Sequence, residues 1–240
     1  MQTIHPSLKH SNKTYEWFPS DTKELFEKNL VNRRNELEKQ GWVEQSIKYE
    51  FNDNGFRKSL KKHNNGDILF LGCSYTFGIG INYQSSFTNI VCEDLKMNNI
   101  NWSIPGSSND TSFRLLNEHL STSTPKMVIF VSPNASRFEL LTNEMNTTIS
   151  HNICVHDTMS DPPLPTNEKI PLYFFNDRYS MENREKNKLA IEMVCQKNKI
   201  KLFCFKDSDL EMIDYGRDLM HPGINSNLLF SRKILDSIKI

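Results

Sequence analysis

Short apolar runs alternate with segments of helical spacing through most of the chain after residue 60. Short, mostly apolar runs bounded by turn residues predict buried strands, and apolar residues three or four apart predict helices. The predicted strands are 67–71, 100–104, 127–131 and 200–205, and the predicted helices are 87–97, 111–120, 182–198 and 222–238. Strands that alternate with helices predict an α/β fold with a parallel sheet and helices on both of its faces.

The pattern differs near the N-terminus and in one later stretch. Residues 1–46 are predicted to form an irregular leader and then a charged helix over 20–39, with Asp21 near its start. The main domain is expected to span 47–240. Within it, residues 136–180 show no clear period and contain four prolines, so we interpret them as an insertion or a cap over the site.

Composition excludes several classes of function. Lys and Arg number 29, as do Asp and Glu, which argues against a nucleic-acid or anionic-membrane partner. The polar N-terminus lacks the apolar core of a signal peptide, and no apolar stretch is long enough to span a bilayer. Five cysteines without CxxC spacing argue for reduced thiols and against a zinc site or a disulfide framework. We therefore expect a cytoplasmic protein that acts on a small molecule.

Polar residues suited to catalysis follow the predicted strands. Ser74 comes after the first strand, Gly106 after the second and Asn134 after the third. Asp218 and His221 come after the last strand, just before the final helix. Since sites in parallel α/β sheets form at the carboxyl ends of the strands, we expect these five residues to meet at one edge of the sheet.

These residue types match the needs of acyl transfer. A serine hydroxyl such as that of Ser74 becomes a nucleophile when an imidazole, here His221, removes its proton. Asp218 would hold the imidazole tautomer and stabilise the imidazolium. The N–H groups of Ser74 and Gly106 and the amide of Asn134 would stabilise the oxyanion of the tetrahedral intermediate.

Four segments also resemble, in the same order, the sequence blocks of the SGNH hydrolase family, the GDSL-type esterases and lipases. They are Gly72-Cys73-Ser74 with the tail Thr76-Phe77-Gly78, then Gly106, then Asn134, then Asp218 to Pro222. Residues 52–57 are similar to a segment upstream of the nucleophile in some members. The resemblance implies a flavodoxin-like three-layer α/β/α fold with about five parallel strands in the order 2-1-3-4-5. It assigns Ser74, Asp218 and His221 to a triad and Ser74, Gly106 and Asn134 to an oxyanion hole, with no metal and no cofactor.

Two positions depart from the family pattern. Cys73 stands where aspartate is usual, but that aspartate is no triad member, and Cys73 is expected to pack below the site as a small hydrophobe. Ser132 and Ala135 flank Asn134 where glycine and aspartate are expected, and the simpler interpretation of Asn134 is a turn residue after the strand.

The remaining candidates have simpler interpretations. His5, His10, His63 and His119 are predicted to face solvent, whereas His151 and His156 fall in the insertion and could reach substrate. Arg137 and Glu139 could line the pocket, although a surface ion pair is the simpler interpretation.

The predicted function is hydrolysis of small acyl esters, with acetyl esters of a carbohydrate or similar polar molecule implied by the resemblance. Two alternatives stay open: an acyltransferase that uses the same triad, and a binding module that keeps the fold without catalysis. A nucleotide-binding domain is disfavoured, because the loop at Gly72 lacks both glycine spacings that cradle phosphates.

Overall fold

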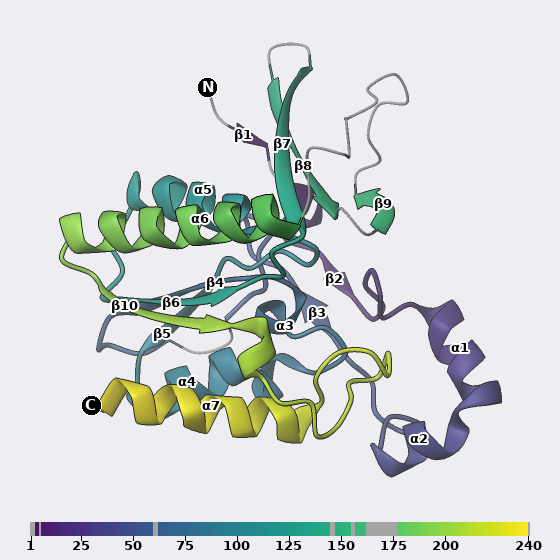
Figure 1. Ribbon diagram of the computed structural model, residues 1–240. Helices are drawn as coiled ribbons and strands as arrows, with labels where there is room; N and C mark the ends of the chain where they lie inside the picture. Colours follow the sequence, from purple (N-terminus) through teal and green to yellow (C-terminus); the bar gives the residue numbers. More distant parts are fainter. Residues whose placement is uncertain are drawn as a thin grey trace.

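The computed structural model describes residues 3–4, 6–59, 62–144, 147–154, 157–161 and 177–239. At its centre lies a parallel sheet in the spatial order β5-β4-β6-β10 (Figure 1). Its strands are β4 (Asp67–Leu71), β5 (Asn98–Asn101), β6 (Met127–Ser132) and β10 (Lys201–Lys206). Counted along the chain this order is 2-1-3-4, which confirms the expected arrangement for these four strands. Within the described part of the chain the sheet has no fifth strand, where we expected about five.

Helices cover both faces of the sheet, which confirms the three-layer α/β/α architecture. Helices α4 (Phe87–Leu95) and α7 (Ile224–Lys239) lie on one face, and α5 (Asn109–Leu120) and α6 (Asp177–Lys197) lie on the other (Figure 1). The side chains of β4 alternate between these two layers, as a strand buried on both faces requires. Its even-numbered residues pack in the buried cluster with α4 and α7, and its odd-numbered residues Leu69 and Leu71 pack in the cluster with α5 and α6.

Serine caps fix where two of these helices begin. The Ser86 hydroxyl accepts a hydrogen bond from the N–H of Asn89 at the start of α4, and the Ser108 hydroxyl accepts one from the N–H of Thr111 at the start of α5. The α5 cap also ends the loop that carries Gly106. None of the helices in the described residues combines the length and apolar character needed to cross a bilayer.

The N-terminal part forms a small unit beside the sheet. Strand β2 (Thr14–Tyr15) pairs antiparallel with β3 (Tyr49–Glu50). Two helices, α1 (Lys23–Asn32) and α2 (Arg34–Lys39), replace the single predicted helix, because the backbone leaves the helical conformation at Arg33. Side chains of this unit form a third buried cluster, which also takes in Phe77 and Leu219 from the main domain. That cluster joins the N-terminal unit to the loops that carry the candidate site.

The first part of the predicted insertion contains regular strands, although its sequence shows no clear period. Strands β7 (Arg137–Glu144), β8 (Thr147–Cys154) and β9 (Asp157–Asp161) pair antiparallel, and β1 (Thr3–Ile4) pairs with β8. In Figure 1 the β7–β8 hairpin extends away from the central sheet on the side of α5 and α6. The predicted insertion continues into residues 162–176, which lie outside the described residues.

The short helices are α3 (Ser74–Phe77) and the 3-10 turns η1 (Pro6–His10), η2 (Tyr83–Ser85) and η4 (Asp207–Asp209). Helix α3 directly follows the central strand β4, and it places the candidate nucleophile at the carboxyl end of the sheet.

Candidate active site

Ser74 is the first residue of α3, at the turn between β4 and that helix. Its side chain is largely buried, and its hydroxyl lies 4.0 Å from Sγ of Cys73. Because the N–H groups of the first helical turn have no partner within the helix, the N–H of Ser74 points out of the helix start. Ser74 therefore has a hydroxyl and an outward-pointing N–H at one position, the two groups on which its predicted roles depend.

Side chains, rather than a longer helix, hold the carbonyl end of α3. The Arg57 guanidinium donates to the carbonyl oxygens of Phe77, Gly78 and Ile81, at 2.8 Å for Phe77 and 2.7 Å for Ile81. Asn101 donates its amide to the carbonyl of Thr76 at 2.9 Å. These donors satisfy buried carbonyl groups that a four-residue helix leaves without partners.

Arg57 is buried, and its neighbours are rings and carbonyl groups. Its guanidinium lies 5.1 Å from the ring centroid of Tyr49 and 5.3 Å from that of Phe77. Burial lowers the pKa of Arg57 to about 10, so it is still a cation at neutral pH. Sequence reasoning singled out 52–57 as family-like but did not find this role. The available signal was an arginine that directly follows a turn containing Asn52 and Gly55.

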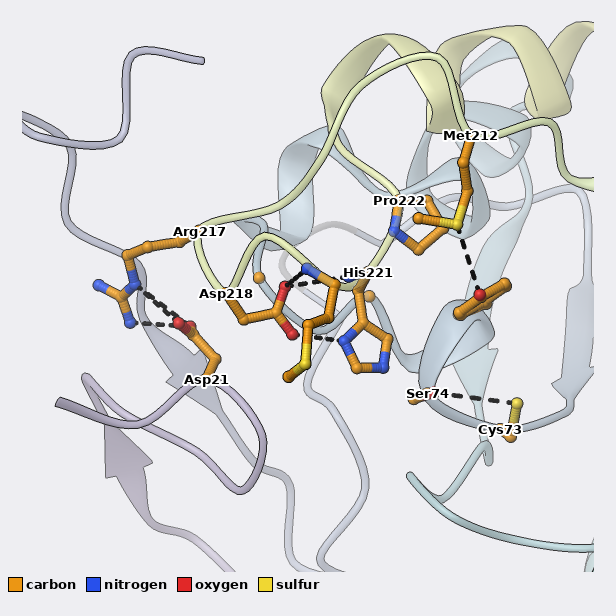
Figure 2. A network of polar contacts seen from close by, with 12 residues as sticks. Asp21, Cys73, Ser74, Met212, Arg217, Asp218, His221 and Pro222 are labelled. Atoms are coloured by element: carbon orange, nitrogen blue, oxygen red, sulfur yellow. Dashed lines mark hydrogen bonds and ion pairs between the residues drawn. The ribbon is translucent and has the colours of Figure 1, made fainter. Parts of the chain in front are cut away.

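Asp218 and His221 form a hydrogen-bonded pair in a single turn (Figure 2). Nδ1 of His221 lies 2.5 Å from Oδ2 of Asp218, whose carboxylate is completely buried. The other oxygen, Oδ1, accepts the N–H groups of Met220 at 3.1 Å and of His221 at 3.0 Å. A carboxylate that accepts from Nδ1–H leaves Nε2 as the nitrogen that can take up a proton.

The two halves of the predicted triad face one another. In Figure 2 the edge of the His221 ring that carries Nε2 points toward Ser74. The ring of Tyr75 meets the His221 ring edge-on at 5.7 Å, and the Tyr75 hydroxyl donates to Sδ of Met212 at 3.5 Å. In this structure the Ser74 hydroxyl is not hydrogen-bonded to His221. Catalytic hydrogen bonds of this kind often tighten only in the complex with substrate.

Gly106 is the exposed residue of the loop between β5 and α5, with φ +81°. This left-handed conformation favours glycine, and a Cβ placed there would have no heavy atom within 4 Å. Ser107 ties the same loop to the nucleophile strand, because its hydroxyl donates to the carbonyl of Gly72 at 2.9 Å. No described atom of the protein fills the space beside the Cα of Gly106.

Asn134 lies in the exposed turn after β6. Its Oδ1 accepts both the N–H and the hydroxyl of Ser136, each at 2.9 Å. Asn134 thus acts as a turn residue through its Oδ1, and these two contacts leave its amide Nδ2 unused. Asn109, the next candidate for a third donor, is buried and donates its amide to the carbonyl of Pro133 at 3.2 Å.

Cys73 is buried, in keeping with the interpretation as a small hydrophobe. The ion pair expected at Glu139 exists, but it is buried rather than at the surface, and its partner is Arg114 on α5. Nη2 of Arg114 lies 2.8 Å from Oε1 of Glu139. Glu139 therefore points toward α5, and this pair fastens the base of the β7–β8 hairpin to the main domain.

The expectation that the other histidines face solvent is wrong for His119. His119 is only 4% exposed and packs edge-on against Trp102, with 4.7 Å between the ring centroids. His10 packs among aromatic rings, and His63 lies 3.3 Å from Glu93. His5 and His156, and the side chain of His151, lie outside the described residues.

Comparison with known proteins gives matches at the level of structure only. No protein-family model matches the sequence, and no curated protein sequence matches it either. Among solved structures, esterase EstA from Pseudoalteromonas sp. aligns at 15% identity with a TM-score of 0.36, over 72% of this chain and 96% of its own. A lipolytic protein of the G-D-S-L family from Desulfitobacterium hafniense aligns at 13% identity and 0.36, over 71% and 98%. A member of the same family from Veillonella parvula aligns at 14% and 0.35, over 71% and 96%. All three are esterases or lipolytic proteins.

Proposed function

We propose that the protein is a serine esterase in which Ser74, His221 and Asp218 act as nucleophile, base and orienting acid. The observation that carries this proposal is the Asp218–His221 pair, whose imidazole faces Ser74 at the start of α3. A buried carboxylate fixes one nitrogen of the imidazole and turns the other toward a hydroxyl, the arrangement that nucleophilic catalysis by serine requires.

The reaction follows from these positions. Nε2 of His221 takes the proton of the Ser74 hydroxyl while the oxygen bonds to the ester carbonyl carbon. The carbonyl oxygen becomes an oxyanion, held by the N–H groups of Ser74 and Gly106 and by the amide of Asn134. Collapse of this intermediate breaks the ester bond, and the leaving alkoxide takes the proton from His221. Water then attacks the acyl group on Ser74 by the same route and releases the acid.

The proposed substrate is a small acyl ester, with acetyl the first choice, on a carbohydrate or a similar polar molecule. The resemblance of the four sequence blocks supports this choice, and the open space beside Gly106 is compatible with it. We propose that the segment 136–180 caps this site, and that the protein works in the cytoplasm. The described cysteines Cys73, Cys92, Cys195 and Cys204 are free thiols, which a reducing compartment preserves.

A fluorophosphonate probe tests the proposal directly, because it reacts with activated serines. We expect covalent labelling of Ser74, located by peptide mass spectrometry, and hydrolysis of p-nitrophenyl acetate. Ser74→Ala should abolish the labelling and lower hydrolysis by at least about 10³-fold. A folded wild-type protein that neither labels nor hydrolyses would point to the binding module. Acyl transfer to an added sugar in preference to water would point to the acyltransferase.

A further inference from the structure

The loop that follows Ser74 and the loop that carries His221 touch each other through their backbones. A Cβ on Gly216 would lie 3.0 Å from the Cα of Gly80, and a Cβ on Gly80 would lie 3.1 Å from Oδ1 of Asp218. The N–H of Arg217 donates to the carbonyl of Gly80 at 2.8 Å. Any displacement between these two loops therefore changes where Asp218 lies relative to the nucleophile turn.

Two side chains from the N-terminal part join the same two loops. The N–H of Gly80 donates to the Tyr49 hydroxyl at 2.8 Å, and that hydroxyl donates to Oδ2 of Asp21 at 2.5 Å. The Asp21 carboxylate in turn accepts Nε of Arg217 at 3.0 Å and Nη2 at 2.8 Å (Figure 2). Asp21, Tyr49 and Arg217 thus form a continuous chain of hydrogen bonds from one loop to the other, which we call the N-terminal bridge.

The three side chains of the N-terminal bridge are buried, so water does not compete for their hydrogen bonds. Tyr49, Asp21 and Arg217 are each 1% exposed or less. Burial raises the pKa of Tyr49 well above its usual value, which keeps the hydroxyl protonated as a donor. A satisfied polar network in a buried setting is rigid, because each group would lose its partner if the network moved.

Further contacts hold Arg217 in place from the same side. Its Nη2 donates to the carbonyl of Glu16 at 2.6 Å, and its guanidinium lies 3.8 Å from the ring centroid of Trp17. Trp42 donates its indole N–H to the carbonyl of Tyr215 at 2.8 Å, one loop residue earlier than Gly216. The N-terminal part therefore contacts the His221 loop through hydrogen bonds and a cation–π contact as well as through the N-terminal bridge.

We propose that Tyr49 and Asp21 are positioning residues of the esterase: through Arg217 and Gly80 they set the place of Asp218 and His221 relative to Ser74. The inference rests on the proposed function, and it gives the unit that contains Asp21 and Tyr49 a part in the geometry of the site. Tyr49 and Asp21 touch neither Ser74 nor His221, so they act only through the two loops.

Tyr49→Phe is the sharpest test, because it removes one hydroxyl oxygen and keeps the ring that stacks on Phe77 and packs against Phe18. We expect kcat for p-nitrophenyl acetate to fall by about 10- to 100-fold with KM little changed, since small misplacement of catalytic groups has effects of this size. Hydrogen–deuterium exchange should rise in both loops, at residues 78–81 and 215–222. The matched control is Tyr83→Phe, another buried tyrosine, whose hydroxyl donates to Ser59. This control should lower the melting temperature by a similar amount and leave kcat and exchange at residues 215–222 unchanged.

The outcomes distinguish a failure of the N-terminal bridge from a failure of the proposed esterase function. If the wild type neither labels nor hydrolyses, the proposed function fails, and exchange decides about the bridge: a rise in both loops supports it and unchanged exchange refutes it. If the wild type is active, an unchanged kcat in Tyr49→Phe overturns the inference. Should Tyr49→Phe not fold, Arg217→Lys is the second variant, because it keeps the charge and loses the two-point contact with Asp21. A normal kcat in Arg217→Lys would overturn the inference in the same way.

Discussion

Nδ1 of His221 lies 2.5 Å from Oδ2 of Asp218, and two backbone N–H groups of the same turn occupy the other carboxylate oxygen. The two backbone N–H groups fix the orientation of the carboxylate, so the turn itself determines where Oδ2 meets the imidazole. Leu219, between the two residues, has φ +55°, a conformation that costs a non-glycine residue free energy. Leu219 is buried in the third cluster, among side chains of the N-terminal unit, and this packing opposes relaxation of the turn.

This pair predicts how Asp218→Asn should behave. The Asn variant keeps an oxygen for the N–H groups of Met220 and His221. Its amide NH2, which is a donor, then faces Nδ1 in place of the charged acceptor. We expect kcat to fall by about 10²- to 10⁴-fold, because the tautomer and the imidazolium lose their support. His221→Ala should cost more and should match Ser74→Ala, since the members of a triad act as a unit.

The pH profile is the accompanying measurement. In the wild type kcat/KM should rise with pH over the range in which an imidazole loses its proton, because only the neutral ring accepts the serine proton. A flat profile would remove His221 from the role of base, and an Asp218→Asn variant as active as the wild type would remove Asp218 from the role of its orienting partner.

Asn134 permits a test that separates its two interpretations. Asn134→Asp keeps the oxygen that accepts from Ser136 and so keeps the turn, but it removes the amide donor. We expect kcat to fall by about 10²- to 10³-fold if the amide acts on the oxyanion. The melting temperature should stay close to that of the wild type. Steady-state kinetics alongside thermal unfolding checks both expectations.

Ser136→Ala is the control for Asn134, since it weakens the turn and leaves the amide in place. It should lower stability by about 0.5–1.5 kcal/mol, the size of one hydrogen bond, without changing kcat per folded molecule. If Asn134→Asp turns over normally, the third oxyanion donor lies elsewhere. Asn109 is then the first candidate, because its amide has a second N–H besides the one that it donates to the carbonyl of Pro133.

The sequence predicted the centre of the fold well and its periphery less well. Strand β6 consists of MVIFVS, is buried throughout, and could be recognised from composition alone. Strand β5 is Asn98–Asn101, and three of its four residues are asparagines, so the predicted strand began two residues late. The hairpin β7–β8 was missed because its mostly polar sequence lacks the buried-strand pattern. Its pairing is set by neighbouring strands, which a local pattern does not contain.

The residues around the candidate site divide in the same way. Ser74, Asp218 and His221 were predictable because each lies just beyond a strand or just before a helix, in the chain order that the resemblance gives. Asp21 and Arg217 could not be paired from sequence, because 196 positions separate them and only the folded structure brings them together. His119 was predictable in hindsight, since it lies three residues after the buried Leu116 on the same face of α5.

Arg57 should be required for the stability of the nucleophile turn. Arg57→Met keeps the length of the side chain but leaves the carbonyls of Phe77, Gly78 and Ile81 without their donor. At about 1–3 kcal/mol for each buried orphan, the loss should be at least about 3 kcal/mol. For a chain of this size that corresponds to a fall in melting temperature of about 6–12 °C, measurable by calorimetry.

Arg34→Met is the matched control for Arg57, because Arg34 is an exposed arginine that pairs with Glu38 at 2.7 Å. Exposed pairs of this kind contribute only about 0–1 kcal/mol, so the control should melt close to the wild type. Equal melting temperatures for the two variants would show that the carbonyl end of α3 does not need Arg57.

His119 should make stability depend on pH below neutrality. Burial lowers the pKa of His119 in the folded protein, and the opposing effect of Asp67 is smaller. As pH falls through the pKa of an unfolded-chain histidine, about 6.5, the unfolded state binds the proton first, and stability is lost toward acid. The contribution of neutral, buried His119 to the free energy of unfolding is thus fully present above that pH.

In His119→Gln the group that takes up this proton is gone. The glutamine amide can still reach the Ser123 hydroxyl, which lies 2.9 Å from Nε2 of His119. Urea unfolding at pH 8 and pH 5 should therefore show a smaller loss of stability on acidification in the variant than in the wild type. An equal loss in both proteins would mean that His119 is not the titrating group, whatever its burial.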